Sequence, residues 1–384
     1  MMETLPPPLA GIRVLDFSRM LAGPLCTALL ADAGAEVIKV EGLQGDDARH
    51  FAPRAGSESA YFLLINRGKR SVTLDLKTAE GRQAAQALAA RSDIVVENFK
   101  PGVAARLGID YATLSAINPR LVYASISGFG QDGPWSHRPA YDIVAQAMSG
   151  IMSVNGPAGS GPTRVGESIG DIVAGLQATW AILAALHGRQ RDGRGQHLDV
   201  AMVDSLFAIM VTALSQYLFT GEVPQRIGNA HPISAPLDSF EASDGHLVIA
   251  VANDALFARL AAAVDVPELA TDPRFATDIA RKRNEAALKS ILEGWTNCRS
   301  VAEAVETLER AEVPASPILS LDQVVMSAHV RARGLVRSVL HPTAGSIPVV
   351  PQPVRFLGSG IIPTRPAPLL GQHSKEVLRE LGLR

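Results

Sequence analysis

Residues 11–40 read GIRVLDFSRMLAGPLCTALLADAGAEVIKV and predict how the fold begins. The apolar run at 11–17 is typical of a buried strand, and residues 24–32 predict a helix with proline in its first turn. Gly34 ends that helix, and residues 35–40 form a second apolar run. A strand, a helix and a second strand in this order predict two parallel strands joined by a crossover helix.

The same alternation continues along the next hundred residues. Residues 71–76, 93–97 and 121–126 predict three more strands, and residues 79–90 a helix between two of them. Their continuous Val and Ile runs indicate strands that are buried on both faces. The sequence therefore predicts an α/β fold, in which a large Rossmann-like domain holds a parallel sheet.

A smaller α+β domain is expected to follow, because the pattern changes near Pro224. Beyond it we expect a strand at 246–251 and then several short helices. We place the N-terminal part of the large domain at 1–224, the small domain at 225–325, and a C-terminal segment that returns to the large domain at 326–384.

The composition of the 384 residues narrows the functional class. The formal net charge of -2 argues against a nucleic-acid partner. The two cysteines, Cys26 and Cys298, lie far apart, which predicts no disulfide and no metal site and favours a reducing cytoplasm. The longest apolar stretch, 172–186, is shorter than the ~20 residues of a membrane span, so no membrane partner is expected.

Two short motifs suggest other chemistries. Residues 128–133 spell the dinucleotide fingerprint G-x-G-x-x-G, but no helical pattern follows directly, so we interpret them as a loop. Residues 166–170 spell the G-x-S-x-G of a hydrolase elbow, with Ser168 as its nucleophile. The stretch before it is a poor strand, which leaves a serine hydrolase as an alternative only.

Asp171 follows that second motif and stands at the start of a strongly apolar helix. One interpretation is a helix N-cap, whose side chain accepts backbone N–H groups. The other is a nucleophile that the helix terminus keeps ionised by lowering its pKa, with Gly170 allowing a substrate to approach. The two interpretations are compatible.

Six segments in this order resemble the family III CoA-transferases, over residues 9–383. They are VLDF with AGP (14–17, 22–24), GAEVIKVE (34–41), NRGKRS (66–71), ENFKPG (97–102), GESIGD (166–171) and LLGQH (369–373). The resemblance implies an interlocked homodimer of Rossmann-like large domains and small domains. It also implies that Asp171 is the catalytic aspartate and that coenzyme A is a substrate, with no permanently bound cofactor.

The resemblance further implies which residues border coenzyme A. The matching positions are Leu21, Ala22, Leu74, Lys77, Asn98, Phe99, Lys100, Arg106, Ala140, Tyr141 and Asp142. Arg70 is added because its charge suits a phosphate-bearing ligand. His231, at the entry to the small domain, is a candidate contact for the acceptor acid, together with Gly170.

The expected reaction moves CoA from an acyl-CoA donor, of succinyl type, to a carboxylic acid through aspartyl intermediates. Formyl-CoA:oxalate enzymes carry glutamine in place of Leu21, arginine in place of Gly42, and a glycine run that residues 228–236 lack, which argues against oxalate as acceptor. The alternative within the family is an α-methylacyl-CoA racemase. Such racemases place a histidine where this chain has Tyr141, and a tyrosine is a poor base at neutral pH.

Overall fold

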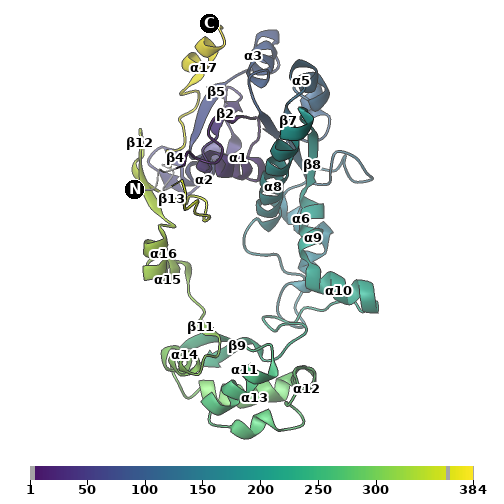
Figure 1. Cartoon of the computed structure of the whole chain (residues 1–384), viewed down its shortest axis with the longest axis vertical. Coiled ribbons are helices and arrows are strands. Elements are labelled where there is room, and N and C mark those ends of the chain that lie inside the picture. The colour runs from purple at the N-terminus through teal and green to yellow at the C-terminus, as the bar shows by residue number, and fades with distance from the viewer. Residues whose placement is uncertain (1–4, 360–363, 384) are drawn as a thin grey trace. The chain divides into compact units, whose positions relative to one another are not determined.

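The computed structural model describes residues 5–359 and 364–383. The chain forms two compact units (Figure 1). The large unit comprises residues 1–151, 165–210 and 328–384, and the small unit comprises 152–164 and 211–327. Residues 211–224, which we expected in the large domain, therefore belong to the small unit, together with the loop at 152–164.

The large unit is built on a six-stranded parallel sheet. Its strands lie in the order β5-β2-β1-β6-β7-β8, which is 3-2-1-4-5-6 when they are counted along the chain, the Rossmann order. The strands are β1 (Arg13–Asp16), β2 (Glu36–Glu41), β5 (Lys69–Thr73), β6 (Ile94–Glu97), β7 (Val122–Ser127) and β8 (His197–Ala201). The α/β fold with a parallel sheet is thus confirmed.

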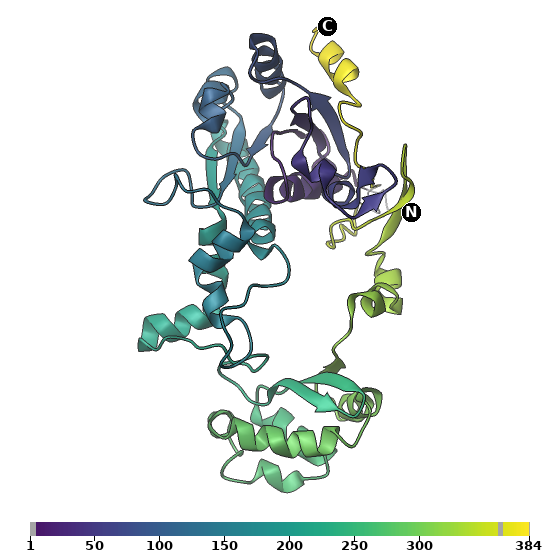
Figure 2. The same cartoon turned by 180° about the vertical axis from the view of Figure 1, so that it is seen from behind.

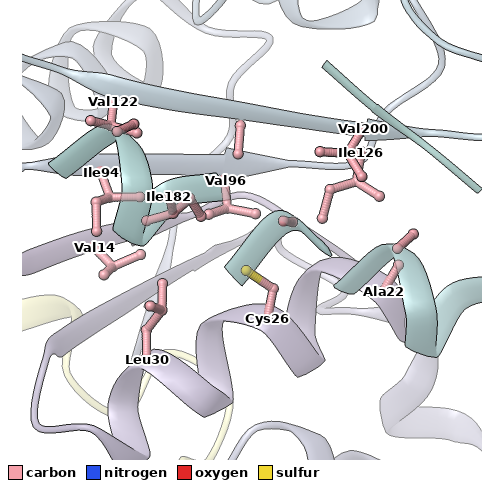
Figure 3. Close-up of a cluster of buried hydrophobic side chains, with 14 of the residues drawn as sticks. Val14, Ala22, Cys26, Leu30, Ile94, Val96, Val122, Ile126, Ile182 and Val200 are labelled. Carbon is pink, nitrogen blue, oxygen red and sulfur yellow. The ribbon is translucent and has the colours of Figure 1, made fainter. Parts of the chain in front are cut away.

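Alternating side chains of the four central strands, β1, β2, β6 and β7, enter two hydrophobic layers. Val14 of β1 points to the layer that helices α1 (Ala22–Asp32) and α8 (Ile169–Asp192) cover, and Figure 3 shows this cluster around Cys26. Leu15 points to the opposite layer, under α3 (Ala79–Ala89) and α5 (Tyr111–Ile117). Because both faces are covered, the strands can be apolar throughout.

The other described elements of the large unit surround this sandwich (Figures 1 and 2). They are η1 (Asp47–His50), β3 (Arg54–Ala55), β4 (Glu58–Ser59), α2 (Ala60–Ile65), α4 (Val103–Arg106), α6 (Asp142–Ser149), α7 (Ile151–Val154, shared with the small unit), α9 (Met202–Ile209), α16 (Ala328–Arg333), β12 (Arg337–His341), β13 (Gly345–Val349) and α17 (Ser374–Glu380). The C-terminal segment does return to the large unit, where β13 packs on α2.

The small unit has its own hydrophobic core around an antiparallel sheet of order β11-β10-β9. Its elements are α10 (Val211–Thr220), β9 (Leu237–Ala242), β10 (Gly245–Ala250), α11 (Asp254–Ala263), η2 (Pro267–Ala270), α12 (Asp278–Arg283), α13 (Glu285–Thr296), α14 (Val301–Arg310), β11 (Ala315–Pro317) and α15 (Leu321–Val325). The expected α+β character is confirmed.

Helix α8 is longer than the sequence indicated. It has 24 residues and, within the described ranges, is the one helix that is long and apolar enough by itself to cross a membrane. Its buried residues, Ala174, Ala178 and Ile182 among them, nevertheless pack into the core shared with α1 and the sheet. We therefore interpret α8 as a core helix because of its packing; the short length that we had expected does not support this interpretation.

Candidate functional site

The strand order places a crevice at the centre of the sheet. The chain leaves β1 toward β2 on one side, and β6 starts the other half of the sheet on the opposite side. Ligands of doubly wound folds bind at this switch point, beyond the carboxyl ends of the two central strands. Here those ends lead into residues 17–22 after β1 and into residues 98–102 after β6. Both stretches contain residues expected to border coenzyme A.

Helices α1 and α8 meet beside this crevice. The N-cap of α1, Leu21, has no side chain that can accept a hydrogen bond, and the backbone N–H of Ala22 instead stabilises the ionised carboxylate of Asp171. The approach is close because Gly175 of α8 faces α1, where an added Cβ would lie 2.7 Å from the Ala22 carbonyl oxygen. The amino end of α1, with its positive partial charge, is thereby directed at Asp171.

Asp171 occupies the first turn of α8 but does not cap that helix. The helix begins at Ile169 after Ser168, so Asp171 is the third helical residue, and the N-cap interpretation is wrong. The expected lowering of its pKa is also wrong. Burial and the negative charge of Asp142 raise the pKa of Asp171 to about 6, and they outweigh the lowering effect of the Ala22 N–H. With a pKa of about 6, the carboxylate is still predominantly ionised at pH 7, the form that can act as a nucleophile.

Asp142 connects the starts of two helices. It is buried at the first position of α6, where Oδ1 accepts the Gly170 N–H at 2.8 Å and Oδ2 accepts the Gln146 side-chain amide at 2.7 Å. These bonds fix the residue before Asp171 relative to α6. Tyr141, the N-cap of α6, is 73% exposed.

Tyr61 of α2 belongs to the same neighbourhood, and sequence reasoning missed it. Burial, followed by the negative charges of Asp171 and Glu167, raises its pKa to about 12. Its ring also lies against Phe51, with 5.7 Å between the ring centroids. No motif surrounds Tyr61 in the sequence, so nothing there indicated its proximity to Asp171.

A cavity of about 500 Å³ lies beyond the ends of β1, β2 and β5. It brings together Leu74, Lys77 and Phe99 from the expected coenzyme A set, with Ser18 and Leu43 as further lining residues. Leu74 is buried, whereas Lys77 is exposed at the rim. Apolar walls with a cation at the rim suit a ligand that has an aromatic base and phosphate groups.

Other residues of the expected set lie at this edge of the sheet without lining the cavity. The Asn98 amide accepts the Arg19 N–H and donates to the Arg19 carbonyl, both at 2.8 Å, so its contacts are with the loop after β1. Lys100 is exposed just after β6, and Arg106 is exposed at the end of α4. Ala140 is half-buried before α6.

Arg70 and His231 lie elsewhere. The guanidinium group of Arg70 pairs with three carboxylates, those of Glu36, Glu376 and Glu380, and not with the cavity. His231 belongs to the small unit, where its Nδ1 accepts two backbone N–H groups of its own loop. In the described residues, both side chains therefore have structural contacts.

The two competing motifs have no support in the local structure. Residues 128–133 lie in the loop between β7 and α6, and the nearest helix begins only at Asp142, so the geometry of a dinucleotide fingerprint is absent there. Ser168 follows the irregular segment 155–167 and not a strand. A nucleophile elbow requires that strand.

The geometry defines a class: a doubly wound protein that has a carboxylate of raised pKa at the start of α8 and, beyond the carboxyl ends of its strands, a cavity suited to a nucleotide-like ligand. Comparison with known proteins is more specific. Residues 9–374 match the model of CoA-transferase family III. The chain belongs to this family and is a CoA-transferase, so CoA thioesters are its substrates.

Curated relatives cover nearly the whole chain. An acetyl-CoA:oxalate CoA-transferase from Acetobacter aceti is 40% identical over 98% of this chain and 96% of its own length. A succinate–glutarate CoA-transferase from Agrobacterium fabrum is 39% identical over the same shares. A crystal structure of a CaiB/BaiF family protein from Brucella suis is 39% identical, covers 98% of this chain and all of its own, and superposes with a TM-score of 0.86.

Proposed function

We propose that the protein transfers CoA from a succinyl-CoA-type donor to a short dicarboxylic acid, with Asp171 as the covalent carrier. The observation that carries this proposal is the contact between the Asp171 carboxylate and the N–H of Ala22 at the amino end of α1. That N–H donor, fixed in place, can stabilise an oxyanion that forms on the aspartyl group. The names of relatives that act on succinyl-CoA with glutarate or mesaconate support the choice of substrates.

The transfer proceeds in two exchanges. The Asp171 carboxylate attacks the donor thioester carbonyl, the C–S bond breaks, and a mixed anhydride and CoA thiolate result. The thiolate attacks the aspartyl carbonyl, which leaves an aspartyl-CoA thioester and the donor acid. The acceptor carboxylate then attacks that thioester, forming a second anhydride and thiolate. The thiolate finally attacks the acceptor carbonyl, which gives the new acyl-CoA and restores Asp171.

The test is to detect the covalent intermediate. Protein incubated with succinyl-CoA is digested and analysed by mass spectrometry for CoA on the peptide that contains Asp171. Hydroxylamine should convert this adduct to a hydroxamate, and Asp171→Ala should abolish it. The absence of an adduct with succinyl-CoA and acetyl-CoA alike would contradict covalent transfer through Asp171.

An acceptor panel decides the substrate. Glutarate, mesaconate and oxalate are compared in the presence of succinyl-CoA, and the new acyl-CoA is quantified by chromatography. We expect transfer to the longer acids to exceed transfer to oxalate, because Leu21 and Gly42 stand where the formyl-CoA:oxalate enzymes carry glutamine and arginine. Preferential transfer to oxalate would contradict this choice of acceptor.

We also propose that the enzyme is an interlocked homodimer. One support is an apolar stripe on α8, formed by Leu176, Trp180 and Leu183, which are 50%, 68% and 42% exposed in the single chain. Their spacing puts all three side chains on one face of the helix, and an apolar patch of this kind marks an interface. Light scattering should give twice the chain mass, and Trp180→Glu should lower it; a monomeric wild-type protein would contradict the proposal.

A further inference from the structure

Four charged side chains that the transfer chemistry does not use are buried where the carboxyl end of β1 lies beside β2, the loop that follows β2, and the first residue of β5. Asp16, Lys39, Asp46 and Lys69 are 0%, 0%, 1% and 4% exposed. Charges at such depth are costly unless each one is paired and hydrogen-bonded. The hydrogen-bond partners of these side chains show which part of the backbone the cluster fixes in place.

The Lys39–Asp46 ion pair makes hydrogen bonds to the turn that follows β1, residues 18–20. Lys39 Nζ lies 2.9 Å from Asp46 Oδ2 and donates to the Ser18 carbonyl at 2.8 Å. Asp46 Oδ1 accepts the backbone N–H of Met20 at 3.1 Å and that of Ala48 at 3.0 Å. One buried pair thus binds backbone groups at both ends of the Ser18–Met20 turn.

The Asp16–Lys69 pair holds the same turn from the other side. Asp16 accepts the Ser18 N–H at 2.9 Å and the Thr27 hydroxyl at 2.7 Å. Lys69 Nζ lies 2.9 Å from Asp16 and donates to the Pro24 carbonyl at 3.0 Å. Pro24 and Thr27 belong to the first turns of α1, so this pair fixes the helix that the Ser18–Met20 turn enters.

The turn itself is strained. Met20 has a φ of +66°, a left-handed conformation that residues with a Cβ rarely adopt. Such a conformation persists only where the surroundings enforce it. Two residues later, the Ala22 N–H stabilises the ionised carboxylate of Asp171 and so lowers its pKa. The direction of that N–H therefore depends on the contacts that hold Met20.

We infer that the Lys39–Asp46 pair positions the nucleophile: by holding the Ser18–Met20 turn, it directs the Ala22 N–H at the Asp171 carboxylate. The inference rests on the proposed function. Lys39 and Asp46 both border the cavity beyond β5, but their side chains are 0% exposed and bond to each other and to backbone groups, so they are positioning residues and not ligand contacts. Loss of the pair should slow the covalent step without weakening acyl-CoA binding to the same extent.

The test variant is Lys39→Met/Asp46→Ala, which removes both charges together and so leaves no unpaired buried ion. Lys39→Met/Asp46→Asn is the conservative variant, since its amide oxygen can still accept the Met20 N–H. The control is Arg67→Met/Asp32→Ala, which removes a similarly buried pair of the large unit, 2.6 Å apart with both side chains 4% exposed. Neither Arg67 nor Asp32 has a described hydrogen bond to the Ser18–Met20 turn.

The measurement is the rate of CoA adduct formation on Asp171 by quenched-flow mass spectrometry over a range of succinyl-CoA concentrations, alongside thermal melting. We expect the alanine variant to lose about ten-fold or more in maximal rate, the asparagine variant to recover part of it, and half-saturation to change by less than about three-fold. The control should melt earlier and still react within about two-fold of wild type.

A folded alanine variant with the wild-type rate would overturn the inference, as would a control that is slowed equally. If the alanine variant does not fold, the asparagine variant decides: at the wild-type rate, it too overturns the inference. A wild-type enzyme that forms no adduct contradicts the proposed function and the inference together. A wild-type adduct whose rate the variants leave unchanged contradicts the inference alone.

Discussion

The carboxylate of Asp142 accepts the backbone N–H of Gly170 at 2.8 Å, which places a buried acid close to Asp171, the proposed nucleophile. This contact joins α6 to the first turn of α8 and helps to raise the pKa of Asp171. Asp142 thus has two separable effects on Asp171, one on its position and one on its charge.

The effect on charge is tested with Asp142→Asn. Adduct formation needs the ionised carboxylate, so its rate in the wild type should rise with pH around a midpoint near 6. Removing the negative charge of Asp142 favours ionisation of Asp171, and the midpoint should move to lower pH. Asp204→Asn, an exposed change on α9, should leave it in place. A midpoint that Asp142→Asn leaves unchanged would show that Asp142 does not act on Asp171 through charge.

The effect on position is tested with Gly170→Ala. An added Cβ would lie 3.1 Å from Asp142 Oδ1 and 3.3 Å from Leu206 Cδ1, so these side chains or the start of α8 must move by a few tenths of an ångström. We expect the adduct rate to fall by about ten-fold, since small displacements at a reacting group are costly. Gly188→Ala on the same helix meets nothing within 4 Å and should stabilise the protein by about 0.5–1 kcal/mol without slowing the reaction. Equal rates for both variants would exclude a tight fit at Gly170.

Recognition of coenzyme A is tested with Lys77→Ala. This cation lies at the rim of the cavity beyond β5, and its loss should raise the KM for acyl-CoA by about ten-fold, more at low salt, if it contacts a phosphate group. Arg70→Ala is the matched control, because the Arg70 charge is already paired with glutamates. If the KM rises with Arg70→Ala and not with Lys77→Ala, then Arg70 and not Lys77 contacts coenzyme A.

Stability should depend on pH through Glu97. This side chain is 3% exposed at the end of β6, and burial raises its pKa to about 7. The folded state therefore holds a proton that the unfolded chain loses above pH 4.5. The resulting stabilisation, about 3 kcal/mol, is complete below that pH and is lost as the pH rises through 7. The free energy of unfolding, measured with urea at pH 5 and at pH 8, gives this loss directly. Glu97→Gln should reduce the difference between the two values. If the variant loses as much stability as the wild type between pH 5 and pH 8, the proton belongs to another group.

Much of the parallel sheet could be predicted because its strands are apolar on both faces. β8 was missed, since its sequence, His197–Ala201, alternates polar and apolar residues at a sheet edge. β5 begins at Lys69 and not at Ser71, because Lys69 is buried by its ion pair with Asp16, which no local pattern reveals. The apolar stretch at 205–219 forms parts of two helices, α9 and α10, which are separated at Met210.

The proposed nucleophile could be chosen from the sequence, but its surroundings could not be predicted. Asp171 belongs to a recognisable Gly-Asp pair with Gly170, whereas its raised pKa comes from burial and from Asp142, 29 positions earlier. Tyr61 approaches from α2, with more than a hundred residues between. For Arg70 the sequence suggested a contact that the structure does not show. Its charge near a family motif predicted a contact with coenzyme A, whereas its guanidinium group pairs with glutamates such as Glu376.

The outer edge of β5 is closed by residues that are about three hundred positions away in the chain. The Ser71 N–H donates to His373 Nδ1, the Ser71 carbonyl accepts the His373 N–H, and the Thr73 N–H donates to the Ser374 hydroxyl. During synthesis, β5 emerges from the ribosome long before residues 373–374, which bond to its edge. A nascent chain therefore presents a bare strand that can pair with other chains, and we expect its yield in cells to depend on chaperones that shield it until translation ends.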